Sequence, residues 1–258
     1  MIQPVLMNFS GVYEEEKFYR KFSGELLSLR TLEGTNCYCT PEAEEQIKAW
    51  IEKYPVRGIH FLDSGNYHYV TKFWIDRMQV PFDLLVFDNH TDMQEAAFFG
   101  LLSCGSWVRA SLEQNPFLRQ VCVVGPPRAS VEELQDDKGE LSKRVTFVTR
   151  EDLQEGKTEA YRVFLRENNQ PLYLSVDKDV LRKEDAATNW DQGEMTLCEL
   201  LNMTEEIRQF REIAGIDICG EGAAAEGIWN PEEVRINEKT NAILLEKTGC
   251  QIDRNVVV

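Results

Sequence analysis

Short apolar segments rich in β-branched and aromatic residues recur along the chain. Most of them are apolar at nearly every position rather than at every second one, which is typical of strands buried on both faces of a sheet. Seven such segments predict strands, at residues 5–9, 58–62, 82–87, 120–124, 144–148, 171–176 and 212–218. We therefore expect a parallel sheet that is covered on both sides.

Helical patterns lie between these segments. Thr40 followed by Pro41 is typical of an N-cap and a first helical residue, and a Thr-x-x-Glu capping box at residues 196–199 predicts a second helix start. A closing helix is predicted over residues 237–247, with Gly249 just past its end. Strands that alternate with helices indicate βαβ units. Because no linker or repeat divides the chain, we expect one α/β/α domain over residues 1–258.

Metal-capable side chains follow three of the predicted strands. Asp88-Asn89-His90-Thr91-Asp92 follows residues 82–87, and Asp177-Lys178-Asp179 follows residues 171–176. A Ser-Gly-Asn turn after residues 58–62 leads to His68, one of only three histidines in the chain. The carboxyl ends of parallel strands collect function at one edge of the sheet. The sequence therefore predicts one shared metal site.

The spacing within the first motif limits how it can bind metal. In a fully extended strand, Asp88 and Asp92 would lie roughly 13 Å apart, too far for one ion. Either the chain curls after His90, or the ligands serve two ions about 3.5–4 Å apart. Four carboxylates would balance two divalent ions. Oxygen-rich ligation with one imidazole per ion favours Mn²⁺, with Fe, Zn or Ni as alternatives.

These motifs carry a resemblance to a known family. Gly65-Asn66-Tyr67-His68, the motif at residues 88–92 and Ser175-Val176-Asp177-Lys178-Asp179 resemble, in the same order, the three metal-binding motifs of the arginase/agmatinase/formiminoglutamase (ureohydrolase) family. The resemblance implies a three-layer α/β/α arginase-like fold with a mostly parallel sheet of about eight strands. It also implies a homo-oligomer, a trimer or a hexamer.

The resemblance further implies a role for each ligand. A hydroxide shared by two Mn²⁺ ions would attack the carbon of a small guanidino, amidino or formimino compound and cleave a non-peptide C–N bond. Asp92 would be the catalytic residue that accepts a hydrogen bond from this hydroxide. The implied ligands are His68 and Asp92 on the first ion, His90 and Asp179 on the second, and Asp88 and Asp177 between the two.

The positions that would bind substrate depart from the family pattern. Cys104 stands where the family often has a proton-shuttling histidine, and Glu221 is one residue late for the usual guanidinium anchor. Gln94 and Glu226 are the other candidate substrate contacts. The acidic side chains that could face the ions across the pocket are Glu221, Glu226, Asp191 and Glu194. These changes favour a divergent branch over arginase itself.

Two other functions are compatible with the same motifs. One is a metal-dependent deacylase or amidohydrolase on the related arginase–deacetylase fold, although the paired histidines usual there are absent. The other is a metal-binding regulatory homologue that has lost turnover, which the missing histidine and the displaced glutamate would explain. The product released from a substrate distinguishes the three.

The composition limits the kinds of partner that we expect this protein to bind. The net charge of −16 argues against nucleic acid, since that affinity depends on Lys and Arg neutralising phosphates. No segment reaches the roughly 20 apolar residues of a membrane span, and no signal peptide is visible. The seven cysteines are scattered, and Cys37-Tyr38-Cys39 lacks a second pair at zinc-finger spacing. We expect reduced thiols, a cytoplasmic location and a small-molecule substrate.

Overall fold

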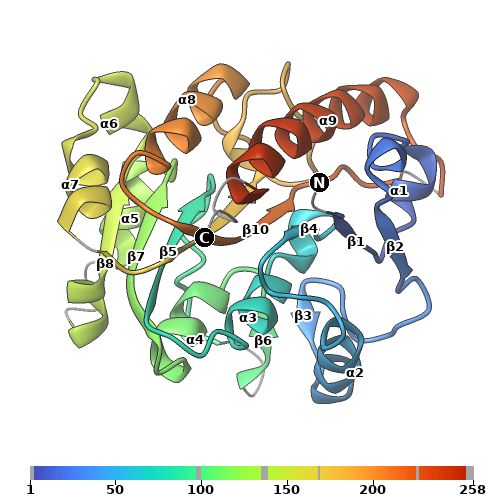
Figure 1. Cartoon of the computed structure of the whole chain (residues 1–258), viewed down its shortest axis with the longest axis horizontal. Coiled ribbons are helices and arrows are strands. Elements are labelled where there is room, and N and C mark those ends of the chain that lie inside the picture. Colours follow the sequence, from blue (N-terminus) through green and yellow to red (C-terminus); the bar gives the residue numbers. More distant parts are fainter. Residues whose placement is uncertain (1–2, 97–99, 135–138, 168, 225–226, 254–258) are drawn as a thin grey trace.

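Eight parallel strands form the central sheet (Figure 1), in the order β2-β1-β4-β10-β9-β5-β7-β8. The computed structural model describes residues 3–96, 100–134, 139–167, 169–224 and 227–253. A short antiparallel pair, β3 and β6, lies apart from this sheet. The strands are β1 (Val5–Asn8), β2 (Glu25–Ser28), β3 (Tyr38–Cys39), β4 (Ile59–Phe61), β5 (Phe82–Phe87), β6 (Leu102–Ser103), β7 (Leu118–Val124), β8 (Val145–Val148), β9 (Leu172–Asp177) and β10 (Ile213–Cys219).

Helices cover both faces of the sheet. In Figure 1, α8 and α9 lie above it and α2, α3 and α4 below it. The helices are α1 (Val12–Glu15), α2 (Pro41–Ile51), α3 (Val70–Ile75), α4 (Trp107–Gln114), α5 (Arg128–Leu134), α6 (Arg150–Gln154), α7 (Glu159–Glu167), α8 (Leu197–Ile207) and α9 (Pro231–Asp253). Short 3₁₀ turns are η1 (Arg20–Phe22), η2 (Gly65–Tyr67), η4 (Glu140–Arg144) and η5 (Lys178–Val180).

The apolar runs reflect burial on two sides. Successive side chains of a strand point to opposite faces. Leu85 and Phe87 of β5 therefore pack into the core that α7, α8 and α9 cover, whereas Leu84 and Val86 pack against α2, α3 and α4. The three-layer α/β/α fold is confirmed.

All seven predicted strands are present, with ends that differ by one or two residues. The prediction missed β2. This strand lies at the edge of the sheet and is only partly buried, so its residues, Glu25–Ser28, give a weak apolar signal.

The predicted helix starts are also confirmed. The Thr40 side chain accepts a hydrogen bond from the Ala43 amide, and both reciprocal bonds of the Thr196 capping box are formed. The bounds of the closing helix were wrong, because α9 begins at Pro231 and Gly249 lies inside it. Asn230 Oδ1 accepts from the Glu232 amide at 3.0 Å and starts the helix early. Packing of α9 against the sheet outweighs the local preference of glycine for a helix end.

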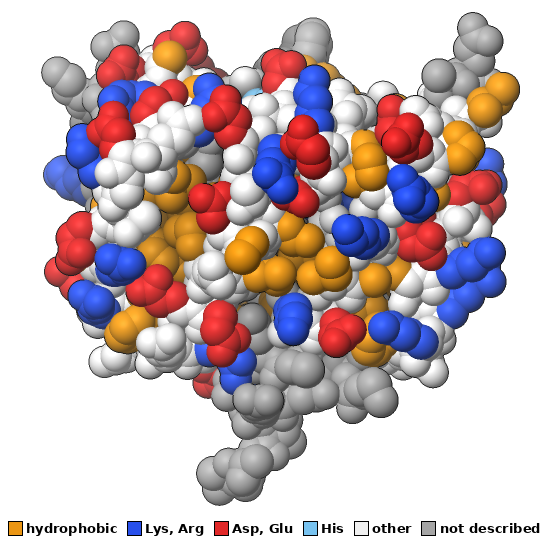
Figure 2. All heavy atoms as spheres, turned by 90° about the horizontal axis from the view of Figure 1, so that it is seen from above, with side chains coloured by type: hydrophobic (Ala, Val, Ile, Leu, Met, Phe, Trp, Pro, Cys, Tyr) orange, Lys and Arg blue, Asp and Glu red, His pale blue; other side chains and the backbone are white. Residues whose placement is uncertain are grey.

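The surface carries charges of both signs. On the face seen from above in Figure 2, acidic and basic side chains are interspersed and hydrophobic side chains lie exposed between them, so no single basic patch covers this face. None of the helices within the described ranges combines the length and the apolar character that crossing a membrane requires.

A buried ion pair ties the connection before β10 to β5. Arg211 Nη2 lies 2.6 Å from Asp83 Oδ2, and both side chains are fully buried. Removing one partner of such a pair leaves an uncompensated buried charge.

We expect Arg211→Ala to lower the free energy of unfolding by about 3–5 kcal/mol, measured by urea denaturation. Arg208→Ala is the matched control, because Arg208 makes a partly exposed pair with Glu205 and should cost less than about 1 kcal/mol. Equal losses in both variants would contradict the prediction.

Candidate metal centre

Four neighbouring strands bring the predicted motifs together. The strands β4, β10, β9 and β5 are adjacent in the middle of the sheet, and all are parallel. Their carboxyl ends therefore meet at one edge. His68 follows β4 after the η2 turn, Asp88 follows β5, and Asp177 ends β9.

The chain curls after His90, which is one of the two alternatives that the distance argument left open. The strand β5 ends at Phe87, and Asp92 adopts a left-handed backbone conformation with φ of 50°. The His90 amide donates to Asp88 Oδ1 at 2.6 Å, which tightens the turn. Trp107 Nε1 donates to Asp92 Oδ2 at 2.6 Å and fixes that carboxylate. The three side chains of the motif are thereby directed to one place.

His68 is the centre of a first group of ligand atoms. Its Nδ1 lies 3.2 Å from Asp88 Oδ2, 3.1 Å from Asp92 Oδ2 and 3.6 Å from Asp177 Oδ2. On the other side of the ring, Nε2 lies 2.8 Å from Ser175 Oγ. When Nε2 donates to this hydroxyl, Nδ1 presents its lone pair to the carboxylates, which is the tautomer that metal binding needs.

His90 is the centre of a second group. Its Nδ1 lies 2.8 Å from Asp179 Oδ2 and 3.4 Å from Asp88 Oδ1. The amides of Asn89 and Asp179 hold the two acidic residues, donating to Asp179 Oδ1 and to Asp177 Oδ1 at 3.0 and 2.9 Å. Asp88 therefore offers one oxygen to each group.

The electrostatics of the two groups suit cations. Burial lowers the pKa of His90, but Asp179 and Asp88 outweigh this effect and raise the pKa to about 12. Burial and the charge of Asp88 raise the pKa of Asp92 to about 7. Asp88 Oδ2 is buried and accepts no hydrogen bond from the described residues. Within these groups, a buried orphan oxygen and convergent carboxylates fit a pair of divalent ions.

A cavity of about 400 Å³ opens over both groups. Gln94 and Cys104, two of the predicted substrate contacts, line it. The backbone N–H of Gln94 donates a hydrogen bond to Gly105 O at 2.9 Å, and Gln94 lies outside the helices. Trp190 forms one wall, with its ring centroid 5.8 Å from that of His90.

Glu221 faces away from this cavity. It is fully buried and pairs with Lys178, and its Oε1 accepts from Asn241 Nδ2 at 2.8 Å. The predicted substrate role of Glu221 therefore has no support in its placement. Asp191 and Glu194 are likewise absent from the lining, and Glu226 lies outside the described residues.

The sequence did not predict two side chains near the site, one carboxylate and one thiol. Glu133 of α5 lines the cavity, although its sequence pattern indicates only a solvated helix face. Cys219, the last residue of β10, donates to Asp177 Oδ2 at 3.1 Å. The pairing of β10 with β9 carries the signal for Cys219, and that pairing is not visible in the sequence.

Comparison with known proteins identifies the family to which this fold belongs. Residues 60–220 match the model of the Arginase family. An uncharacterized protein of Thermotoga maritima is 32% identical over 240 residues, which cover 93% of this chain and 87% of that protein. The chain belongs to the Arginase family, as a divergent member. Members of this family bind a dinuclear metal site, and the two ligand groups described above are the candidates for it here.

Solved structures support the fold. Proclavaminate amidino hydrolase from Streptomyces clavuligerus aligns with a TM-score of 0.67 at 13% identity, over 96% of this chain and 91% of that one. Formimidoylglutamase from Bacillus subtilis aligns with 0.67 at 16% identity, over 97% and 88%. Agmatine ureohydrolase of Thermoplasma volcanium aligns with 0.66 at 14% identity, over 99% and 92%. At these identities the likeness concerns the fold alone.

The shared position of Asp88 generates a prediction about metal binding. We expect the metal-free protein to take up two equivalents of Mn²⁺ and to gain thermal stability, by about 2.7 kcal/mol for each site when free Mn²⁺ is a hundredfold above the Kd of that site. Asp88→Asn should lose both equivalents, because it removes charge from both groups. Elemental analysis and thermal unfolding measure this. Asp191→Asn is the control and should bind like the wild type, since Asp191 does not line the cavity. If Asp88→Asn retained both ions, Asp88 would not be a ligand that the two groups share.

Proposed function

We propose that this protein is a dinuclear-metal hydrolase, with Mn²⁺ as the first candidate. It cleaves a non-peptide C–N bond in a small guanidino, amidino or formimino compound. The observation that carries the proposal is the pair of ligand groups that share Asp88 at the base of one cavity. The size of this cavity, about 400 Å³, suits a small molecule. We expect a cytoplasmic homo-oligomer, following the family resemblance.

When bound, two divalent ions would supply Lewis acidity and lower the pKa of a coordinated water to about 7. The chain holds the ligands in place with contacts outside the cavity. Ser175 orients His68, and Trp107 holds Asp92. The Asp92 carboxylate lines the cavity and contacts His68, so it is placed to accept a proton from the attacking water.

The cavity lining also contains side chains that are not candidate metal ligands and that could bind the substrate. The Glu133 carboxylate is the acidic group among its lining residues that is not a candidate metal ligand. The Trp190 ring and the Gln94 amide stand beside the same space. A carboxylate, an aromatic wall and an amide suit a cationic amidino compound. Glu133 thus takes the anchoring role that the sequence assigned to Glu221.

No histidine is available to shuttle protons. Of the three histidines, two are the candidate ligands and the third, His60, is buried inside β4. His60 Nδ1 lies 2.7 Å from Asp217 Oδ1, and its ring stacks on Trp74 at 3.6 Å. The leaving group must therefore take its proton from Asp92 or from solvent.

Hydrolysis assays test the function directly. We expect the manganese-loaded protein to release urea or formamide, together with the corresponding amine, from at least one of a panel of guanidino, amidino and formimino compounds. A chelator should abolish turnover, and Asp177→Ala should lower kcat by at least about a hundredfold, because Asp177 faces His68. Release of acetate or formate from an acylated amine would favour the deacylase instead. Metal binding without any turnover would favour a regulatory protein.

Glu133 provides a test of substrate recognition. For a cationic substrate, we expect Glu133→Gln to raise KM about five- to tenfold with kcat nearly unchanged, because a charged contact contributes about 1–1.4 kcal/mol to binding. Glu132→Gln is the matched control, since Glu132 lies on the same helix but lines a different cavity. An equal KM in the two variants would remove Glu133 from the substrate site.

A further inference from the structure

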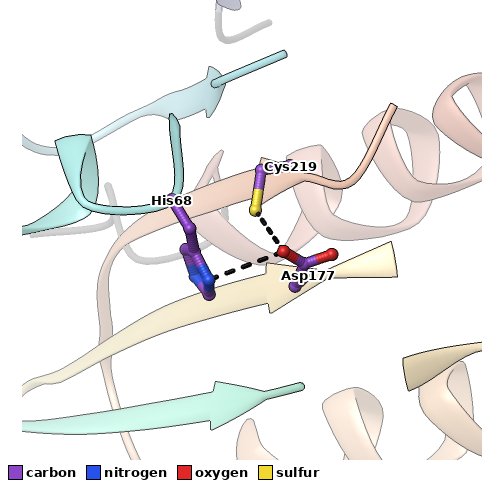
Figure 3. A group of neighbouring side chains, drawn as sticks. All are labelled: His68, Asp177 and Cys219. Carbon is purple, nitrogen blue, oxygen red and sulfur yellow. Dashed lines mark hydrogen bonds and ion pairs between the residues drawn. The ribbon is translucent and has the colours of Figure 1, made fainter. Parts of the chain in front are cut away.

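Cys219 lies beside the first ligand group, on an element that carries none of the predicted ligands. It is the last residue of β10 and pairs in register with Asp177 of β9. Residues paired in this way present their side chains on the same face of the sheet. Cys219 Sγ accordingly donates to Asp177 Oδ2 at 3.1 Å. Figure 3 shows His68, Asp177 and Cys219 directed toward one another from three separate segments.

The spacing of these atoms is that of ligands around one ion. Asp177 Oδ2 lies 3.6 Å from His68 Nδ1 and 3.1 Å from Cys219 Sγ, and one ligand atom from each residue lies within 4.8 Å of the others. Nitrogen, oxygen and sulfur ligands at about 2.0–2.3 Å from a tetrahedral ion lie roughly 3–4 Å apart. All three side chains are buried, and Cys219 does not line the cavity that His68 and Asp177 face.

The backbone after Cys219 makes the close approach possible. Gly220 has a φ of 93°, and a Cβ at this position would lie only 2.5 Å from Asp177 Oδ1. Any side chain here would push the end of β10 away from β9. Asp88 Oδ2, buried and without a hydrogen-bond partner among the described residues, lies 3.2 Å from the same His68 Nδ1. This unpaired buried oxygen indicates a cation beside His68 independently of the thiol.

We propose that Cys219 is a sulfur ligand of the ion held by His68, and that it shifts the preference of this position from Mn²⁺ toward Zn²⁺. The inference rests on the proposed dinuclear site. On binding, the S–H bond breaks, a sulfur–metal bond forms, and the proton passes to the buffer. A soft thiolate ligand favours zinc over manganese more strongly than a carboxylate oxygen does, since carboxylate ligands suit manganese. The group around His90 contains no sulfur, so the two positions differ in metal preference.

The other explanation is that Cys219 is a packing residue, because its side chain also belongs to an apolar cluster. Two further thiols, Cys37 and Cys104, line the cavity and could bind the same ion. Cobalt separates these possibilities. A thiolate bound to Co²⁺ gives an intense charge-transfer absorption in the near ultraviolet, whereas nitrogen and oxygen ligands give only weak visible bands.

The experiment is a Co²⁺ titration of the metal-free full-length protein. We expect the charge-transfer band in the wild type, in Cys104→Ala and in Cys122→Ala, whose buried thiol lies in β7 away from the site. Cys219→Ala and Cys219→Ser should lack the band but still bind cobalt. In competition, Cys219→Ser should lower the preference for Zn²⁺ over Mn²⁺ at least about tenfold, equivalent to about 1.4 kcal/mol. Thermal unfolding checks that the serine variant is folded.

The outcomes separate the two proposals. Cobalt binding without a charge-transfer band in the wild type would overturn the role of Cys219 and leave the dinuclear site intact. A band that persists in Cys219→Ser and disappears in Cys104→Ala would overturn it as well. Failure of the wild type to bind any divalent ion would refute the dinuclear site itself.

Discussion

The mutual repulsion of buried carboxylates is the constraint on which this structure depends. Asp88, Asp92, Asp177 and Asp179 lie within a few ångströms of two imidazoles, and all four are at least nine-tenths buried. Without cations, protons must offset the charge, which is why the pKa of Asp92 and of both histidines is raised. The sheet can hold these groups together because packing on both faces fixes the strand ends. Divalent ions would convert this repulsion into attraction.

A second buried set of charges supports the first. Lys178 lies between two of the acidic residues in sequence but points to the opposite side, where Glu221 and Asn241 surround it. Asn241 also donates to Glu16 at 2.8 Å. Burial and the neighbouring Glu221 raise the pKa of Glu16 well above its ordinary value, despite Lys178. Lys178 and Glu221 carry opposite charges and form a buried ion pair. These contacts tie α9 and α1 to the turn that carries Asp177 and Asp179.

The sequence could predict what depends on local pattern and on strand ends. The acidic motifs could be placed together because parallel strands end at one edge, and the distance between Asp88 and Asp92 in an extended strand predicted either a curl after His90 or two ions. The contacts of Glu221 could not be predicted, because its partners come from η5 and α9 and no local signal joins these elements. The same holds for Glu133, whose place at the cavity depends on how α5 packs. The edge strand β2 and the position of Gly249 inside α9 were missed because tertiary packing outweighs weak local preference there.

The pairing of Lys178 with Glu221 also bears on substrate recognition. A carboxylate that neutralises a buried lysine cannot be withdrawn to bind a substrate cation without leaving that lysine uncompensated, at a cost of several kcal/mol. Glu221 is therefore committed to the fold. If the substrate is a cation, as proposed, its counter-charge must lie elsewhere on the cavity wall, where Glu133 is exposed. Because water screens an exposed carboxylate, it would bind a cation more weakly than a buried carboxylate would.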